Sequence, residues 1–389
     1  MDLRFTPEQD AFRKEARSWL EANVPAEPLA SLDTREGFER HREWEHKLNE
    51  GGWAMVPWPV EYGGRGADLF EWLVFEEEYY RAGAPGRVNQ NGIFLLGPTI
   101  MEYGSPEQKA RYLPKMASSE EVWAQGWSEP NAGSDMAAIQ ATAVREGEHY
   151  VIKGQKTWAS RGAYADWLFG LFRTDPDSER HRGLSFILVP LDAEGVTVRP
   201  IEQLDGEAGF AEVFLDDVRV PVENLLGEES QGWQVAMATA GFERGLMLRS
   251  PARFQNTARK LVELYRETVA GGATLDPALR DEVTRCWMDA EAYTLNTYQT
   301  VSRLLAGGKI AEESSLNKIF WSELDVKMHE TALALLGARA ELLPDAPAAI
   351  GVGGWLDGYL FSLAGPIYAG TNEIQRNVIA ERMLKLPRK

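Results

Sequence analysis

Two stretches of this chain are the most informative, one about a third of the way along it and one near its far end. The first is Trp127-Ser128-Glu129-Pro130-Asn131-Ala132-Gly133-Ser134-Asp135, and the second is Tyr368-Ala369-Gly370-Thr371-Asn372-Glu373-Ile374-Gln375-Arg376. The first is rich in Pro, Asn, Gly and Ser, so taken alone it predicts only a turn with a cap. What the two stretches do together depends on the segments around and between them.

The composition is that of a large globular protein. With 389 residues, 44% hydrophobic and 26% charged, the chain is too long for one simple core, and we expect two or three domains. The formal net charge of −18 argues against nucleic acid or an anionic membrane surface as a partner. The first residues are mixed and charged, unlike a signal peptide, and no apolar run reaches the roughly 18 residues that span a bilayer. A single cysteine, Cys286, permits no internal disulfide, so we expect a cytoplasmic protein.

Residues 1–123 are expected to form an N-terminal helical domain. Thr6 is a good N-cap, and Pro7 suits the first helical position. Helical spacing of apolar residues also marks 69–80 and 94–103. The first helix should bury one face that carries Phe12, Ala16 and Leu20.

Residues 124–229 are expected to form a middle β domain. Short runs rich in β-branched and aromatic residues alternate with turns, which predicts a small β-sandwich or barrel. The region closes at 218–221, because the final Pro cannot donate a hydrogen bond into a central ladder. The runs are 150–154, 167–172, 184–189 and 213–215.

Residues 230–389 are expected to form a C-terminal helical bundle, which makes the fold α+β and multidomain. This order is not that of a dinucleotide-binding parallel sheet, and the glycines of 351–354 do not open a strand–turn–helix unit. The five histidines lack ligand spacing, so no metal site is predicted. Phosphate-loop and nucleophile-elbow motifs are missing as well. The helical stretches are 233–249, 251–269, 277–305, 312–336 and 372–384.

Together, the two opening stretches resemble the signatures of the acyl-CoA dehydrogenase family of flavoproteins. The resemblance covers nearly the whole chain, and the segments 154–160, 183–189 and 216–221 support it. It implies an FAD-dependent oxidoreductase of lipid metabolism that acts on an acyl-CoA, similar to bacterial enzymes of fatty acid or steroid catabolism. It also implies a dimer or tetramer, homo- or hetero-oligomeric, and an electron-transfer partner.

The resemblance also assigns binding residues. A flavin that accepts a hydride gains negative charge, and fixed donors stabilise that charge. Ser134 matches a residue that contacts the thioester arm of the substrate. Without the resemblance, Ser128–Ser134 would be an ordinary turn and Trp158 ordinary core packing. The residues expected to contact FAD are Gln125, Trp127, Ser128, Trp158, Ser160, Thr371 and Glu373.

The implied reaction is α,β-desaturation, in which a base removes the α-proton and the β-hydrogen leaves as hydride to flavin N5. Most family members carry that base as a Glu in the second signature, where this chain has Ala369; its backbone N–H could still polarise the thioester carbonyl. Some branches place the base on a helix, and Glu243 matches that position, in apolar surroundings that favour a basic carboxylate. Arg244 is then expected to orient the carboxylate or the substrate. The alternative is a solvated Glu243 paired with Arg244.

The chain departs from the family in two segments that reach a neighbouring subunit. Residues 269–277 lack the Arg-x-x-Phe-Gly segment that holds the FAD pyrophosphate, and 334–339 replace a Gln-x-x-Gly-Gly-x-Gly segment. Either FAD binds weakly in a homo-oligomer, or a second related chain supplies the missing half. Two other functions therefore stay open: a non-catalytic or half-site partner subunit, and a flavin oxidase or monooxygenase on the same fold.

Overall fold

The computed structural model describes residues 4–246, 250–309, 312–342, 346 and 353–387. Contacts divide the chain into two compact units. The first unit comprises Met1–Phe75 and Ala82–Leu246, and the second comprises Glu76–Arg81 and Met247–Lys389. Helix α3 (Leu69–Arg81) crosses the boundary, so its last turns belong to the second unit.

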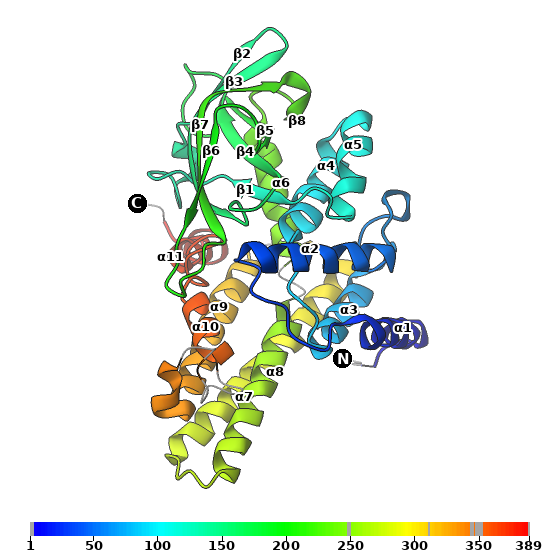
Figure 1. The fold of residues 1–389 in the computed structure, drawn as a ribbon, viewed down its shortest axis with the longest axis vertical. Coiled ribbons are helices and arrows are strands. Elements are labelled where there is room, and N and C mark those ends of the chain that lie inside the picture. The colour runs from blue at the N-terminus through cyan, green and yellow to red at the C-terminus, as the bar shows by residue number, and fades with distance from the viewer. Residues whose placement is uncertain (1–3, 247–249, 310–311, 343–345, 347–352, 388–389) are drawn as a thin grey trace. The chain divides into compact units, whose positions relative to one another are not determined.

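The first unit opens with helices, as the sequence predicts (Figure 1). Thr6 caps α1 by accepting a 3.3 Å hydrogen bond from the Gln9 amide, and the Gln9 side chain accepts one of 3.0 Å from the Thr6 amide. This reciprocal capping box starts the helix, and its Ala16 and Leu20 are fully buried. The helices are α1 (Pro7–Asn23), α2 (Arg35–Glu50), η1 (Val60–Tyr62), α3, η2 (Gly92–Leu96), α4 (Gly97–Tyr103) and α5 (Pro106–Ala117).

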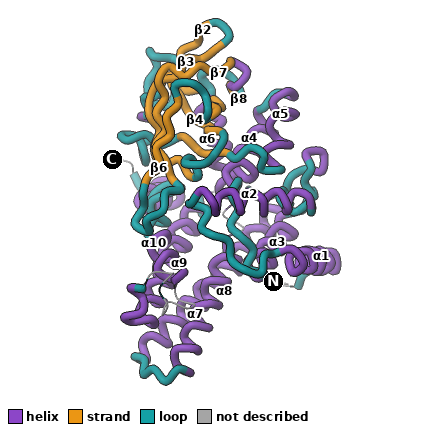
Figure 2. Tube along the Cα trace, in the orientation of Figure 1, coloured by secondary structure: helices purple, strands orange, loops and turns teal. Residues whose placement is uncertain are grey.

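The middle of the chain forms one eight-stranded sheet, drawn in orange in Figure 2. Its order is β6-β7-β3-β2-β4-β5-β8, with β1 beside β4. The four β-rich runs in the sequence fall in β3, β4, β5 and β7, whereas β1, β2, β6 and β8 were not foreseen. The strands are β1 (Trp123–Gly126), β2 (Thr142–Glu146), β3 (His149–Ser160), β4 (Trp167–Arg173), β5 (Leu184–Pro190), β6 (Val196–Ile201), β7 (Phe210–Pro221) and β8 (Leu225–Leu226).

Helix α6 (Gly232–Leu246) completes the first unit, where it contacts β4 and β5 as well as η2 and α4. Its buried Thr239 donates 2.9 Å to the Val235 carbonyl and shares a 2.9 Å hydrogen bond with Thr99 of α4. The helix that carries Glu243 is therefore anchored to both the sheet and the N-terminal helices.

The second unit is helical, so the α+β order of the prediction is confirmed. Helices α7 (Ser250–Ala270), α8 (Pro277–Leu305) and α9 (Ser314–Leu336) pack against one another. Their core contains Phe254, Tyr293, Trp321 and Met328. The unit continues with η6 (Gly337–Glu341), α10 (Gly353–Ser362), α11 (Asn372–Val378) and η7 (Ile379–Met383). Helix α10 was not predicted, because its glycines and lack of polar spacing hide the helical period.

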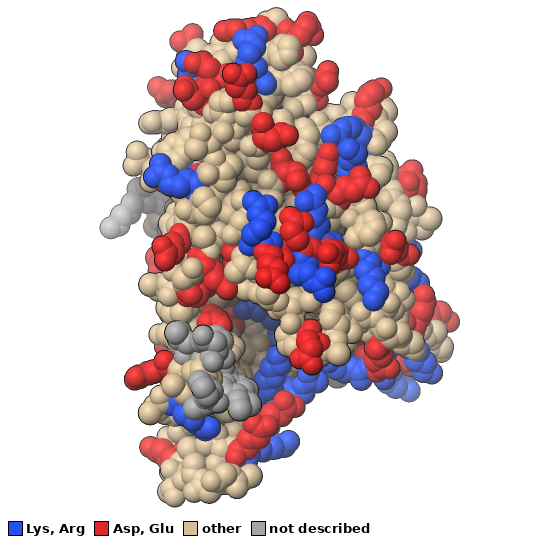
Figure 3. All heavy atoms as spheres, viewed as in Figure 1, with Lys and Arg blue, Asp and Glu red and all other residues tan. Residues whose placement is uncertain are grey.

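The surface of the protein carries charged side chains of both signs. Acidic and basic side chains are interspersed over most of the face that Figure 3 shows. Within the described ranges, every helix is too short or too polar to cross a bilayer.

Candidate functional site

Strand β1 and the loop that follows it carry three of the predicted flavin contacts. Gln125 is half-buried and pairs in register with Phe169 of β4. The Ser128 carbonyl accepts a 2.9 Å hydrogen bond from the Thr157 amide of β3. Residues 125–128 therefore lie beside residues 157–160, and we call Gln125, Trp127, Ser128, Trp158 and Ser160 the candidate cofactor surface.

Trp158 occupies an irregularity in β3. The pairing of β3 with β7 shifts register between Lys156 and Ala159, and Trp158 has φ of 58°. A bulky residue in the left-handed region is uncommon and marks strain at functional sites. The indole is 59% exposed although its neighbours in the strand are buried. The bulge thus presents a large aromatic face outward instead of packing it in the core.

Trp127 contributes an unsatisfied donor to this surface. It is 9% exposed, and its Nε1 is buried without a hydrogen-bond partner in the described part of the chain. Buried donors are normally satisfied. An exposed indole, an orphaned N–H and a half-buried Ser128 together fit a planar aromatic ligand with hydrogen-bond acceptors.

A buried ion pair that the sequence analysis did not recognise supports this surface. Lys156 is fully buried, and its Nζ donates 2.8 Å to Glu129 Oε1 and 2.7 Å to the Leu171 carbonyl. Burial lowers the pKa of Lys156, while the Glu129 carboxylate opposes that shift. Glu129 lies in the first opening stretch, and Lys156 lies in the segment 154–160. A charged residue within each of these strand and turn segments was the signal that could have indicated the pair.

Ser134, the predicted thioester contact, is exposed in the loop that follows Glu129 in the chain. Its neighbour Asp135 accepts two hydrogen bonds from Arg180, of 2.7 and 3.2 Å. Arg173 in turn donates to carbonyls of the Arg180 loop, including that of Arg180 at 2.8 Å. Hydrogen bonds from Arg180 to Asp135 therefore join the exposed loop of Ser134 to the loop of Arg180.

In the second unit, Ala369, Thr371 and Glu373 lie on one turn that leads into α11. Ala369 has φ of 54° and Gly370 has φ of 78°, so the chain reverses tightly there. Thr371 caps α11 by accepting a 3.2 Å hydrogen bond from the Ile374 amide. Hydrogen bonds from the Glu373 backbone and from Thr371 lower the pKa of the exposed Glu373 carboxyl.

The Thr371 cap predicts a local effect on α11. Replacing Thr371 by Ala should cost about 1 kcal/mol in the stability of this helix, because the Ile374 amide loses its acceptor. Amide exchange at Ile374 should then be about fivefold faster, whereas Thr371→Ser, which keeps the hydroxyl, should exchange like the wild type. Equal exchange in Thr371→Ala and wild type would contradict the role of the cap.

Glu243 and Arg244 lie in the last turns of α6, but the side chains of residues 243–250 lie outside the described part of the structure. Their backbone position is described. Glu243 follows the buried Thr239 by one helical turn of α6 and Val235 by two.

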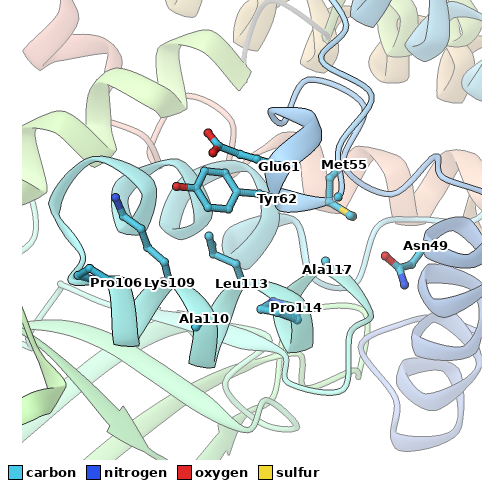
Figure 4. A pocket seen from close by; sticks show the side chains of 11 residues that line it. Asn49, Met55, Glu61, Tyr62, Pro106, Lys109, Ala110, Leu113, Pro114 and Ala117 are labelled. Atoms are coloured by element: carbon cyan, nitrogen blue, oxygen red, sulfur yellow. The ribbon is translucent and has the colours of Figure 1, made fainter.

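A separate groove of about 740 Å³ lies among the N-terminal helices of the first unit (Figure 4). Helix α5 lines one side with Leu113 and Lys109, and Tyr62 and Glu61 of η1 line the other. The sequence-predicted site residues do not line this groove, so its apolar floor does not bear on the assignments above.

Family models match almost the entire chain. The N-terminal, middle and C-terminal domains of acyl-CoA dehydrogenases match residues 6–120, 124–218 and 230–384. The chain is 40% identical to "Acyl-CoA dehydrogenase IpdE1" of Mycobacterium tuberculosis, over 97% of this chain and 98% of that protein.

Solved structures agree with this match. The ChsE4–ChsE5 complex from Mycobacterium tuberculosis is similar with a TM-score of 0.86 and 32% identity, and the similarity covers 100% of both chains. A structure described as "Tcur3481-Tcur3483 steroid ACAD" has a TM-score of 0.86 and 30% identity over the same full coverage. The matched domains and these relatives cover the fold and the site described above. The chain therefore belongs to the acyl-CoA dehydrogenase family of enzymes.

Proposed function

We propose that this chain catalyses α,β-desaturation of an acyl-CoA thioester, with Glu243 as the base that removes the α-proton. The observation that carries the proposal is the pair of residues at the two base positions of the family: a carboxylate at 243 and Ala369 in the second signature. Glu243 lies on a helix that is anchored to both the sheet and the N-terminal helices, which suits a group that must hold a fixed position. Arg244 is proposed to orient the carboxylate or the substrate.

FAD is the proposed cofactor, bound against the candidate cofactor surface with Thr371 and Glu373 toward the rest of the dinucleotide. When bound, it supplies the acceptor for the β-hydride. The contribution of the chain is to place donors and aromatic faces: the Trp127 N–H, the Ser128 and Ser160 hydroxyls and the exposed Trp158 ring. Ser134 is proposed to contact the thioester arm, and the Ala369 N–H to polarise its carbonyl.

The proposal is tested by the visible spectrum of the purified protein under anaerobic conditions. Adding a suitable acyl-CoA should bleach the visible absorption band of the flavin, because the substrate reduces the bound cofactor. A thioether analogue of the same acyl-CoA, which lacks the carbonyl and so has no acidic α-proton, is the matched control and should leave the band unbleached. Failure of a broad acyl-CoA panel to bleach a flavin-loaded protein would contradict the proposal, and rapid peroxide release would indicate an oxidase instead.

The assembly is proposed to be a hetero-oligomer in which a related chain completes the FAD site. Residues 269–277 lack the arginine that the family uses across subunits, and a charge-assisted clamp of this kind contributes about 1.5–3 kcal/mol per hydrogen bond. The ChsE4–ChsE5 structure is itself described as a complex.

Stoichiometry decides between the two kinds of assembly. The singly expressed chain should retain clearly less than one FAD per subunit, and co-expression with its partner should restore it. One tightly bound FAD per subunit in the chain alone would contradict the half-site proposal and leave the dehydrogenase proposal intact.

The substrate, the electron acceptor and the cellular location are also proposals. The relative described as a steroid ACAD makes CoA thioesters of steroid-derived acids the first to test, alongside simple fatty acyl-CoAs. An electron-transfer protein is the proposed acceptor. A cytoplasmic location suits a chain whose single cysteine, Cys286, is free and buried. The three-domain division at residues 123 and 229 also stays a prediction.

A further inference from the structure

The Glu129–Lys156 ion pair connects four segments of the first unit through buried contacts. Lys156 Nζ donates to Glu129 and to the Leu171 carbonyl of β4, and it lies 4.8 Å from the centroid of the Phe172 ring. Glu129 Oε1 also accepts 3.0 Å from the Ala141 amide, and Oε2 accepts 2.6 Å from the Gln140 amide. The loop 127–132, strand β3, strand β4 and the segment 139–141 therefore meet at one pair of charges.

The loop around Glu129 is closed as well as anchored. The Glu129 amide donates 3.0 Å to the Ala132 carbonyl, and the Ala132 amide donates 3.0 Å back to the Glu129 carbonyl. One residue earlier, the Ser128 carbonyl accepts from the Thr157 amide. The backbone around Glu129 thus has little freedom to shift relative to β3 while the ion pair is intact.

The position of the pair along the chain relates it to the candidate cofactor surface. Glu129 directly follows Trp127 and Ser128, and Lys156 is the last residue paired with β7 before the register shift that exposes Trp158. An apolar pair could fill the same space, and a buried ion pair by itself adds little to stability. Two charges at this point are better explained by the geometry that they impose on the residues beside them.

We propose that Glu129 and Lys156 are positioning residues, which hold the segment 127–129 in register with the bulge at 156–160 so that the candidate cofactor surface is preformed. This inference rests on the proposed function in naming FAD as the ligand of that surface. Neither residue needs to touch the ligand. Their role is to fix where the Trp127 N–H, the Ser128 hydroxyl and the Trp158 ring stand before binding.

The test is a double variant that removes both charges while keeping the volume, Glu129→Gln with Lys156→Met. We expect it to fold but to melt below the wild type, because the Leu171 carbonyl and one of the two amides bound by Glu129 lose their partners, and to bind FAD about tenfold more weakly. The circular dichroism of the bound flavin should change too, because that signal reports the surroundings of the ring. Amide exchange at Thr157 and Ala141 should be about tenfold faster, while amides of the β4–β5 pair such as Ile187 stay protected.

Lys153→Met is the matched control, since Lys153 lies on the same strand in an exposed 2.8 Å ion pair with Asp217. It should leave FAD affinity, flavin dichroism and Thr157 exchange as in the wild type. If the double variant does not fold, Glu129→Asp keeps both charges and shortens the reach by one methylene, and the same three changes are expected. Unchanged FAD affinity and dichroism in a folded variant would overturn the proposal.

The exchange measurement separates this inference from the proposed function. If the wild-type chain binds no FAD even when co-expressed with its partner, the cofactor assignment fails, and exchange at Thr157 alone decides whether the pair holds the two segments together. If the wild type binds FAD and the variant exchanges like the wild type at Thr157 and Ala141, the positioning role fails while the cofactor assignment stands.

Discussion

Replacing Glu243 by Gln should lower turnover with an artificial electron acceptor by about 10²–10⁴-fold, the usual contribution of a general base. The amide has nearly the size of the carboxylate but cannot take the α-proton. Binding should be largely retained, so the variant should keep its flavin and still bind the acyl-CoA. The measurement is anaerobic flavin reduction in a single turnover, which isolates the chemical step from product release.

A matched control uses an exposed glutamate on another helix. Glu263 of α7 is solvent-exposed, with Arg259 4.0 Å away, and Glu263→Gln should reduce the flavin at the wild-type rate. Glu243→Asp keeps a carboxylate at a shorter reach and should fall between the wild type and Glu243→Gln. Unchanged reduction in Glu243→Gln would remove Glu243 from the catalytic role and require another base, whereas no reduction in the flavin-loaded wild type would favour the non-catalytic subunit.

Lys318→Met should destabilise the second unit by about 2–5 kcal/mol. Lys318 is 1% exposed, and its Nζ donates 2.8 Å to the Gly365 carbonyl and 2.8 Å to Asn372 Oδ1. Hydrogen bonds from a charged donor contribute about 1.5–3 kcal/mol each. Asn372 Oδ1 still accepts a 3.2 Å hydrogen bond from Ser322. The loss in stability should therefore stay within about 2–5 kcal/mol.

The loss should be local to the turn that carries Ala369, because Lys318 binds Gly365 on one side of that turn and Asn372 on the other. A lower midpoint of thermal or urea unfolding, together with faster amide exchange in 366–374, is the expected result. Lys327→Met on the same helix is the control, since Lys327 is half exposed in a 3.0 Å ion pair with Glu282; exposed pairs contribute at most about 1 kcal/mol. Equal destabilisation by both variants would show that Lys318 has no special role.

Local sequence signals predicted most of the elements. The Thr6 cap and Pro7 set the start of α1, and the α8 limits agree with the predicted 277–305 because Asp276, Pro277 and the helical period all point to the same ends. Strands β2 and β6 were missed because their short, mostly exposed runs give little local signal, and pairing with the next strand, β3 or β7, holds them in the sheet. Helix α10 was missed for the same reason: its neighbours in the second unit, not its own composition, stabilise it.

The candidate site, too, could be predicted only in part from the sequence. Its residues could be named because the two opening stretches and the segments around Gln125, Trp158 and Glu243 resemble the family. Their surroundings could not: the buried partner of Lys156, the acceptors of Lys318 and the outward turn of Trp158 depend on segments distant in the chain. The sequence by itself determined the α+β order, which follows from local period, and it determined the family and the candidate residues through the resemblance of its motifs. Only the tertiary structure decided which charges are buried and which rings are exposed, because burial is a property of packing between segments that the chain order keeps apart.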